Sequence, residues 1–134
     1  MKEKKSSEDI RKWYRYQFFG IATVTVPIEN TVVNATIANI SLSGLGLYST
    51  TPIEKGKTVK VTISFVDKNG RVREDITTGK VDWQKKFLKM YLIGIHFDEE
   101  LNMINQPRLL GHLTWLIDTY RWPQPFKDKR IAML

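Results

Sequence analysis

Two arginines stand four positions apart near the amino terminus, in the segment "RKWYR" that contains Arg11 and Arg15. A guanidinium group forms forked, bidentate hydrogen bonds with phosphate oxygens, and it pairs equally well with the O6 and N7 edge of guanine. Such a pair arises by chance about 0.4 times in a chain of this composition, so its spacing alone is a weak signal. The segment fits both a guanine-nucleotide site and a solvated basic tail.

A second group of small polar residues, "NISLSG", has the spacing Asn39-x-Ser41-x-x-Gly44. Asn39 can bond its own turn while presenting a donor and an acceptor outward, and Ser41 offers a short hydroxyl close to the backbone. Gly44 permits a positive φ or a close approach of the backbone to a ligand. This spacing is expected by chance about 0.03 times, yet Asn, Ser and Gly are also ordinary in a turn between strands. A binding turn and a purely structural turn both remain open.

The third candidate is Trp83, in the strand-like segment "GKVDW". An indole on a strand can stack on a purine, and a strand tryptophan can equally serve only packing. Catalytic chemistry has no comparable candidate. The chain has no cysteine, its two histidines are far apart, and no nucleophile stands at a readable spacing from a base. We therefore expect a binding protein with no catalytic residues and no metal site.

The elements that would position these residues are mainly β-strands. Between residues 20 and 98, apolar and polar residues alternate as expected for strands with one face in a core. The runs are "GIATVTV", "TVVNATIANI", "GLGLYS", "KTVKVTISFVD", "RVREDITTGKVDW" and "KMYLIGIHFD". Six such strands predict a small antiparallel barrel or sandwich.

Local signals refine this prediction. The Asn-Gly of "DKNG", residues 67–70, predicts a two-residue hairpin turn, and Gly79 predicts a bulge or bend in its strand. The spacing then changes to three and four, which predicts an amphipathic helix with Asn105 as a candidate cap and Pro107 near its start. The apolar positions of that helix are Leu109, Leu113, Leu116, Ile117 and Tyr120.

Length and charge limit the class of protein. A chain of 134 residues is long enough for one core, so we expect a single domain over residues 1–134. The formal net charge of +7 indicates an anionic partner. No window approaches the roughly 20 apolar residues that span a bilayer, and the charged amino terminus has no apolar signal region. These features predict a cytoplasmic protein without a membrane span.

The three segments, in this order, resemble the PilZ domain, a bacterial receptor module for cyclic di-GMP. "RKWYR" is similar to the family's RxxxR motif, and "NISLSG" is similar to its [D/N]xSxxG motif. "TTGKVDW" followed by "YLIGIHF" is similar to its closing pattern of a Gly-x-Val strand and a Gly-Ile-x-Phe strand. The resemblance covers about residues 8 to 98.

This resemblance implies a six-stranded antiparallel PilZ-type β-barrel with a C-terminal α-helix. Its parts would be a lead over residues 1–19, a barrel over 20–98, a helix over 105–121 and a tail over 122–134. The resemblance further implies which residues bind cyclic di-GMP. They would be Arg11, Arg15, Asn39, Ser41 and Gly44, with Lys12 and Trp83 as additional candidate contacts.

The function implied is that of a sensor, and not of an enzyme. Cyclic di-GMP would order the N-terminal segment against the barrel, and the changed surface would engage or release an unidentified protein effector. Two alternatives remain. One is a small basic β-barrel that binds RNA or single-stranded DNA, although we do not expect a nucleic-acid partner. The other is a PilZ-like adaptor that acts only through protein contacts.

Overall fold

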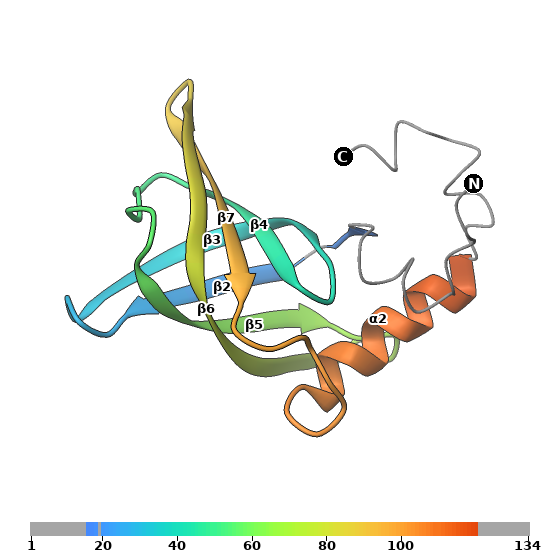
Figure 1. Ribbon diagram of the computed structural model, residues 1–134. Coiled ribbons are helices and arrows are strands. Elements are labelled where there is room, and N and C mark those ends of the chain that lie inside the picture. Colours follow the sequence, from blue (N-terminus) through green and yellow to red (C-terminus); the bar gives the residue numbers. More distant parts are fainter. Residues whose placement is uncertain (1–15, 19, 121–134) are drawn as a thin grey trace, which may run out of the picture.

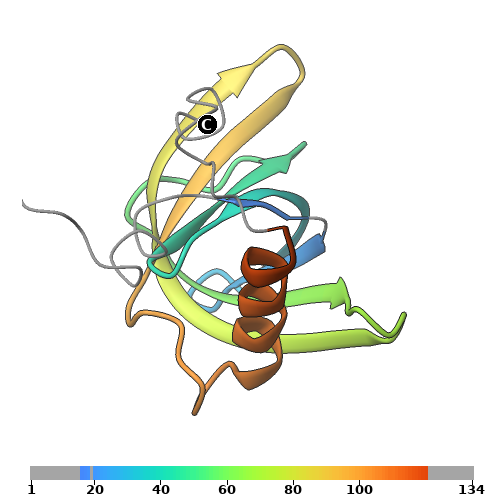
Figure 2. The same ribbon diagram turned by 90° about the vertical axis from the view of Figure 1, so that its right-hand side faces the viewer.

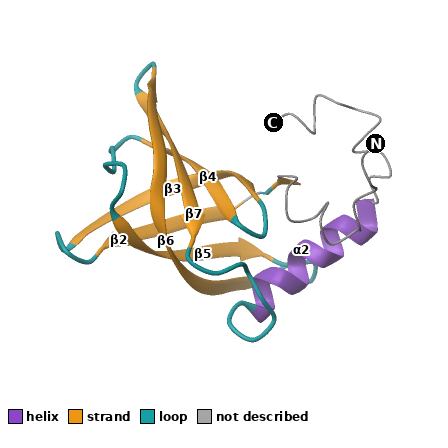
Figure 3. Ribbon diagram, viewed as in Figure 1, coloured by secondary structure: helices purple, strands orange, loops and turns teal. Residues whose placement is uncertain are grey.

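The structure is a computed structural model, and it describes residues 16–18 and 20–120 of the chain. Arg11, Lys12, Arg15 and the predicted tail lie outside the described residues. Figure 3 shows strands for most of the described chain and one helix near its end. The elements are β1 (Tyr16–Gln17), β2 (Gly20–Val26), β3 (Thr31–Ile40), β4 (Gly44–Ser49), β5 (Thr58–Val66), β6 (Val72–Phe87), β7 (Met90–Phe97) and α2 (Pro107–Tyr120).

The strands form a closed antiparallel barrel. Neighbours follow the order β3-β2-β5-β6-β7-β4, and β4 also pairs with β3, which closes the sheet (Figure 1). The short β1 adds to β3 outside this ring of six, with Tyr16 opposite Ile40 and Gln17 opposite Asn39. The predicted six-stranded barrel with a C-terminal helix is therefore confirmed.

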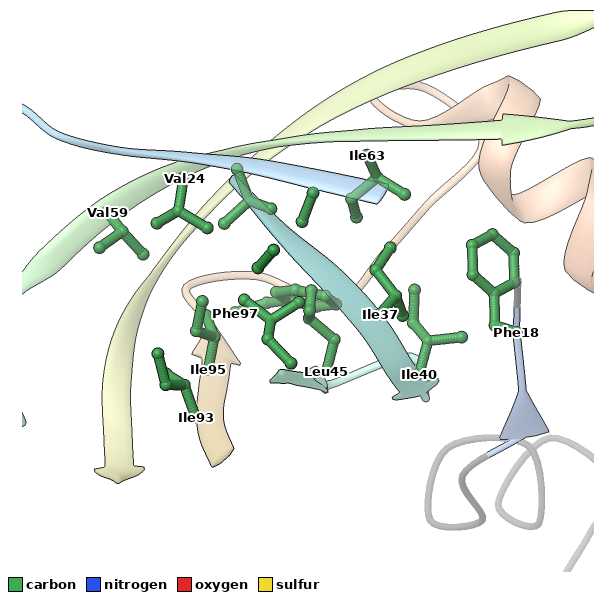
Figure 4. Close-up of a cluster of buried hydrophobic side chains, with 14 of the residues drawn as sticks. Phe18, Val24, Ile37, Ile40, Leu45, Val59, Ile63, Ile93, Ile95 and Phe97 are labelled. Atoms are coloured by element: carbon green, nitrogen blue, oxygen red, sulfur yellow. The ribbon is translucent and has the colours of Figure 1, made fainter. Parts of the chain in front are cut away.

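The core lies inside the barrel, and the alternation of the sequence explains which side chains fill it (Figure 4). Along β5, every second side chain is almost completely buried, because a strand points successive side chains to opposite faces. These residues are Val59, Val61, Ile63 and Phe65, none more than 3% exposed. The same rule buries Ala22, Val24 and Val26 on β2. The predicted alternation, with one face of each strand in the core, is confirmed for β2 and β5.

Helix α2 is held against the barrel by a buried carboxylate. Asp75, on β6 and only 5% exposed, accepts a hydrogen bond of 2.6 Å from the backbone N–H of Leu109 through Oδ2. Its Oδ1 lies 3.2 Å from Nη1 of Arg108. Backbone N–H groups in the first turn of a helix have no partner within the helix, so Asp75 supplies one from another element. The side chains of Leu109 and Leu113, two of the predicted apolar positions of this helix, are buried.

The start of the helix differs from the prediction. Asn105 is not the cap, because the first helical hydrogen bond runs from Leu110 N to Gln106 O. The Gln106 side chain is tied elsewhere: its Nε2 donates to Ile76 O at 3.0 Å, and its Oε1 accepts from Asn102 N at 3.1 Å. A distant strand therefore provides the capping carboxylate, which local sequence cannot reveal.

Two further local predictions were wrong. The β5–β6 connection is not a two-residue turn: it spans residues 67–71, with only Gly70 at positive φ, 78°. Asp67 stabilises this longer turn by accepting hydrogen bonds from the backbone N–H groups of Asn69 and Arg71 at 2.8 and 2.9 Å. Gly79 is not a bulge either, since it pairs regularly with Val59 and Phe97. A Cβ at Gly79 would lie 2.4 Å from His96 O, so this glycine permits close strand packing.

An aromatic cluster joins the first strands to the helix. Phe18 is 2% exposed, and its ring centroid lies 5.8 Å from that of Phe65 and 5.9 Å from that of His112. The His112 ring stacks between Phe65 and Trp115, and burial there lowers its pKa. The chain just before β2 is thus anchored beneath α2. Among the described residues, no helix is long and apolar enough to cross a membrane.

We expect Asp75→Ala to lower the free energy of unfolding by about 1–3 kcal/mol, because it leaves the buried Leu109 N–H without its acceptor. The matched control is Asp82→Ala, which removes an exposed carboxylate from the same strand. Urea unfolding followed by circular dichroism measures both variants. Equal midpoints for the two would contradict the docking role of Asp75.

Acid should weaken the β5–β6 turn. Hydrogen bonds from the Arg71 backbone and the Arg73 side chain lower the pKa of Asp67 from 3.8 to about 2. Because the folded-state pKa is the lower one, ionised Asp67 stabilises the fold above pH 3.8, and this contribution disappears as pH falls through about 2. The difference in thermal midpoint between the native chain and Asp67→Asn should shrink over that range. A difference that stays constant would show that Asp67 ionisation does not contribute.

Candidate functional site

The turn from β3 to β4 contains the predicted Ser41 and Gly44. Ser41 N donates to Gly44 O at 2.9 Å, and Ser41 Oγ lies 3.3 Å from the same oxygen. Ser43 N in turn donates to Ser41 Oγ at 3.3 Å. Ser41 is only 4% exposed, so its hydroxyl stabilises the turn from inside. The predicted contact between Ser41 and a ligand stays a prediction. Ser43, beside it, is partly exposed and is a candidate ligand contact that sequence reasoning missed.

Gly44 is required by close packing of two strands. It is the first residue of β4 and lies opposite His96 of β7. A Cβ at Gly44 would lie 2.4 Å from Ile95 O, which is far inside normal contact. Any larger residue would therefore push β4 away from β7 and disturb the turn that presents Asn39.

Asn39 belongs to a row of four residues across the outer face of the barrel. Asn39 pairs with Gly46, Gly46 pairs with Gly94, and Gly94 pairs with Trp83, so the row crosses β3, β4, β7 and β6. A Cβ at Gly46 would lie 3.0 Å from Asn39 Oδ1, and one at Gly94 would lie 2.2 Å from Trp83 Nε1. The amide and the indole thus lean over a floor of two glycines. We call these four residues the glycine row.

Two β-bulges turn the ends of the glycine row outward. Ile37 and Val81 are buried, and strict alternation would also point Asn39 and Trp83, two positions later, into the core. The register shifts between Ile37 and Asn39 and again between Val81 and Trp83. Each shift inserts one residue and reverses the alternation. Trp83 is consequently 43% exposed, and Asn39 is partly exposed.

Cationic and titratable side chains lie beside this row. His96 pairs with Gly44 on one side and with Lys80 on the other, and both His96 and Lys80 are exposed. On the opposite side of the row, Tyr48 is 41% exposed. Together with the glycine row, these residues form a surface that combines an indole, an amide and a nearby lysine, and we call this surface the platform. Such groups suit a ligand that has both planar rings and negative charge.

In the sequence, the arginine segment directly precedes β1, which pairs beside this platform. Tyr16 and Gln17 of β1 pair with Ile40 and Asn39. In the sequence, Arg15 directly precedes Tyr16, which is paired beside the glycine row. The side chains of Arg11, Lys12 and Arg15 themselves lie outside the described residues. Their part in the site stays a prediction.

A groove of about 390 Å³ on the other side of the Ser41 turn is the competing location. It lies between this turn, the loop before α2 and the helix itself. Its described lining consists of Ser41, Leu42, Glu100, Leu101, Asn102, Met103, Leu110, Leu113, Thr114 and Ile117. The one charged side chain in that set is Glu100, which disfavours an anionic ligand. The glycine row is the better candidate.

Sequence reasoning found Asn39 and Trp83 but missed the two glycines between them. The available signal was a glycine within each strand, in "GLGL" and "LIGI", since a strand glycine often marks a close approach. It also missed His96 and Lys80 as neighbours. Within residues 16–18 and 20–120, no group of three His, Asp or Glu side chains is placed to hold a metal ion.

Two solved structures are similar to this fold. The structure of the Bacillus subtilis inhibitor of motility (MotI/DgrA) matches with a TM-score of 0.64 and 13% identity, and it covers 90% of this chain and 56% of that one. The PilZ domain with c-di-GMP of YcgR from Escherichia coli matches with a TM-score of 0.53 and 15% identity, over 89% and 97% of the two chains. At these identities the likeness establishes the fold alone. The present chain spans only about 56% of the length of the motility inhibitor.

A comparison with functionally curated proteins finds no match. The family model of the PilZ domain, in contrast, matches residues 9–115, which includes the barrel and most of α2. That match extends over far more than half of the sequence and agrees with the observed barrel topology. The chain belongs to the PilZ domain family.

Proposed function

We propose that this protein is a receptor for cyclic di-GMP. The glycine row is the observation that supports the proposal most directly. One guanine would stack on the solvent-facing side of the Trp83 indole, whose other side covers Gly94. The Asn39 amide, at the other end of the row, would hydrogen-bond a polar edge of the ligand. Because Gly94 has no side chain, the indole can lie close against β7.

The phosphates and the second guanine would be bound by the arginines of the lead. Arg15 adjoins the residue paired with Ile40, and Arg11 is four positions earlier, so both are within reach of the platform. A guanidinium fork suits both phosphate oxygens and the O6 and N7 atoms of guanine. Lys80 and Lys12 would add positive charge. The net charge of +7 favours association with a dianionic ligand.

Ligand binding would convert directly into a signal. We infer that cyclic di-GMP draws the part of the lead before β1, residues 1–15, onto the barrel and so changes the surface around β1 and the β3–β4 turn. An unidentified protein effector would recognise one of the two surfaces. In this scheme the protein acts in the cytoplasm as a sensor, and no chemical step is required of it.

The dimensions of the platform favour a compact ligand over a nucleic-acid strand. The glycine row crosses four strands, which are spaced about 4.8 Å apart, so its ends are separated by only about 14 Å. Trp83 is the one large aromatic residue in the row. A single-stranded nucleic acid usually stacks successive bases along a longer groove with several aromatic residues.

Calorimetry with cyclic di-GMP tests the proposal and the role of the arginines. We expect micromolar binding by the native chain and loss of measurable binding by the double variant Arg11→Ala, Arg15→Ala. The matched control, Lys68→Ala with Arg71→Ala, removes the same charge from the exposed β5–β6 turn and should bind as the native chain does. No binding by the native chain at tens of micromolar would refute the proposal, and full binding by the arginine variant would refute the assigned roles.

Trp83→Ala should weaken binding of cyclic di-GMP by roughly 5-fold to 150-fold, because base stacking on an aromatic side chain contributes about 1–3 kcal/mol. Phe87→Ala is the control, since Phe87 is an exposed aromatic residue on the same strand but lies four positions beyond the glycine row. The dissociation constant from calorimetry reports both. Equal effects of the two substitutions would argue against stacking on Trp83.

A further inference from the structure

The hairpin formed by β6 and β7 extends beyond the rest of the barrel. Figures 1 and 2 show it projecting from the end of the molecule opposite α2. Pairing of β7 with β4 ends at Tyr91, and pairing of β6 with β5 ends at Lys80. The last pair, Phe87 with Met90, joins only the two strands of the hairpin. We call residues 85–90 the ribbon tip.

The ribbon tip exposes two large apolar side chains at its apex. Phe87 is 55% exposed and Leu88, the next residue, is 80% exposed. Leu88 also has a φ of 59°, a conformation that favours glycine or asparagine. The two-residue connection between Phe87 and Met90 accounts for the positive φ, but packing within the protein does not explain why the residue there is an exposed leucine. An exposed leucine in a strained turn suggests that its side chain contacts something else.

Three lysines surround this apex. Lys85 and Lys86 precede Phe87, and Lys89 follows Leu88, and all three are exposed. Between Asp82 and Asp98 the sequence has no acidic residue to offset them. Lys86 is supported by the ring of Tyr91, with its Nζ 5.9 Å from the centroid. The two exposed apolar side chains at the apex are thus surrounded by three positively charged side chains.

We propose that the ribbon tip docks on an anionic lipid surface. Phe87 and Leu88 enter the boundary between headgroups and acyl chains, and Lys85, Lys86 and Lys89 contact the lipid phosphates and carboxylates. In a bilayer, the apolar acyl chains lie directly beneath the negatively charged headgroups. The ribbon tip has the complementary arrangement, with apolar side chains at its apex and lysines around them. The contact is peripheral, in keeping with described residues that contain no helix able to span a membrane.

An anionic membrane fits the ribbon tip better than a nucleic acid does. A nucleic acid would also attract the lysines, but Leu88, the more exposed of the two apolar side chains, is aliphatic and cannot stack on bases. The cytoplasmic leaflet of membranes carries anionic lipids, and each lysine near such a surface strengthens binding about fivefold. Three lysines and two inserted side chains together suffice for reversible attachment.

Vesicle co-sedimentation of the full chain, without cyclic di-GMP, tests this surface separately from the nucleotide site. Vesicles of phosphatidylcholine mixed with phosphatidylserine should bind the protein, and vesicles of phosphatidylcholine alone should not. The variant Lys85→Gln, Lys86→Gln, Lys89→Gln should lose about a hundredfold in partitioning, at about fivefold per lysine. The variant Phe87→Ser, Leu88→Ser should lose on the order of tenfold.

The matched control residues lie away from the ribbon tip, on β5, in the β5–β6 turn and at the start of β6. Lys60→Gln, Lys68→Gln, Arg71→Gln removes equal charge, and Val66→Ser, Val72→Ser replaces two exposed apolar residues, 57% and 72% exposed. Both should bind vesicles nearly as the native chain does, and circular dichroism confirms that each variant is folded. As a second readout, brominated lipids should quench the added fluorescence of Phe87→Trp.

Three results would overturn the proposal. The first is equal loss of vesicle binding by the ribbon-tip variants and their controls, and the second is no binding of the native chain to the anionic vesicles. The third is a native chain that ignores vesicles yet binds a single-stranded oligonucleotide through Lys85, Lys86 and Lys89, which would identify nucleic acid as the occupant. None of these results depends on whether cyclic di-GMP binds.

Discussion

The turn over residues 41–43 connects β3 to β4, and the pairing of these two strands closes the sheet into a barrel. β4 must therefore fit between β3 and β7, with almost no space at Gly44 beside Ile95 O. Closure gives every barrel strand an apolar inner face and an outer face. It also brings Asn39 into line with Gly46, Gly94 and Trp83, so the same packing constraint that completes the fold creates the platform.

The platform depends on two interruptions of regular strand structure. A strand with unbroken alternation would bury Asn39 beside Ile37, and Trp83 beside Val81. The bulges reverse the alternation at both places. Bulges cost regular hydrogen bonding, and they are common where a strand must redirect a side chain toward a site. Here the two bulges lie on strands β3 and β6, at opposite ends of one row.

Strand β6, 16 residues from Val72 to Phe87, connects the main parts of the molecule. Near its start, Asp75 caps helix α2 and fixes the helix on the barrel. In its middle, Trp83 covers Gly94 at the edge of the platform. Its end forms the ribbon tip with Phe87. The helix, the platform and the ribbon tip are therefore all attached to this one strand.

The sequence alone determined much of the fold. Period-two alternation identified the six barrel strands, and a change to spacings of three and four located the helix, because these patterns reflect burial along a single element. Short-range motifs also selected Arg11, Arg15, Asn39, Ser41, Gly44 and Trp83 as candidates, of which Asn39 and Trp83 share the glycine row.

Only the tertiary structure decided the features that depend on contacts between distant segments. Local sequence pointed to Asn105 as the cap, whereas the carboxylate comes from Asp75, 34 residues before Leu109. It pointed to a bulge at Gly79, whereas the bulge lies between Val81 and Trp83, where register is set by pairing with β7. The burial of Ser41 and the alignment of Gly46 with Gly94 are likewise set by contacts between distant segments. Strand register and packing arise from many pairings across the barrel, so no single segment contains the information that specifies them.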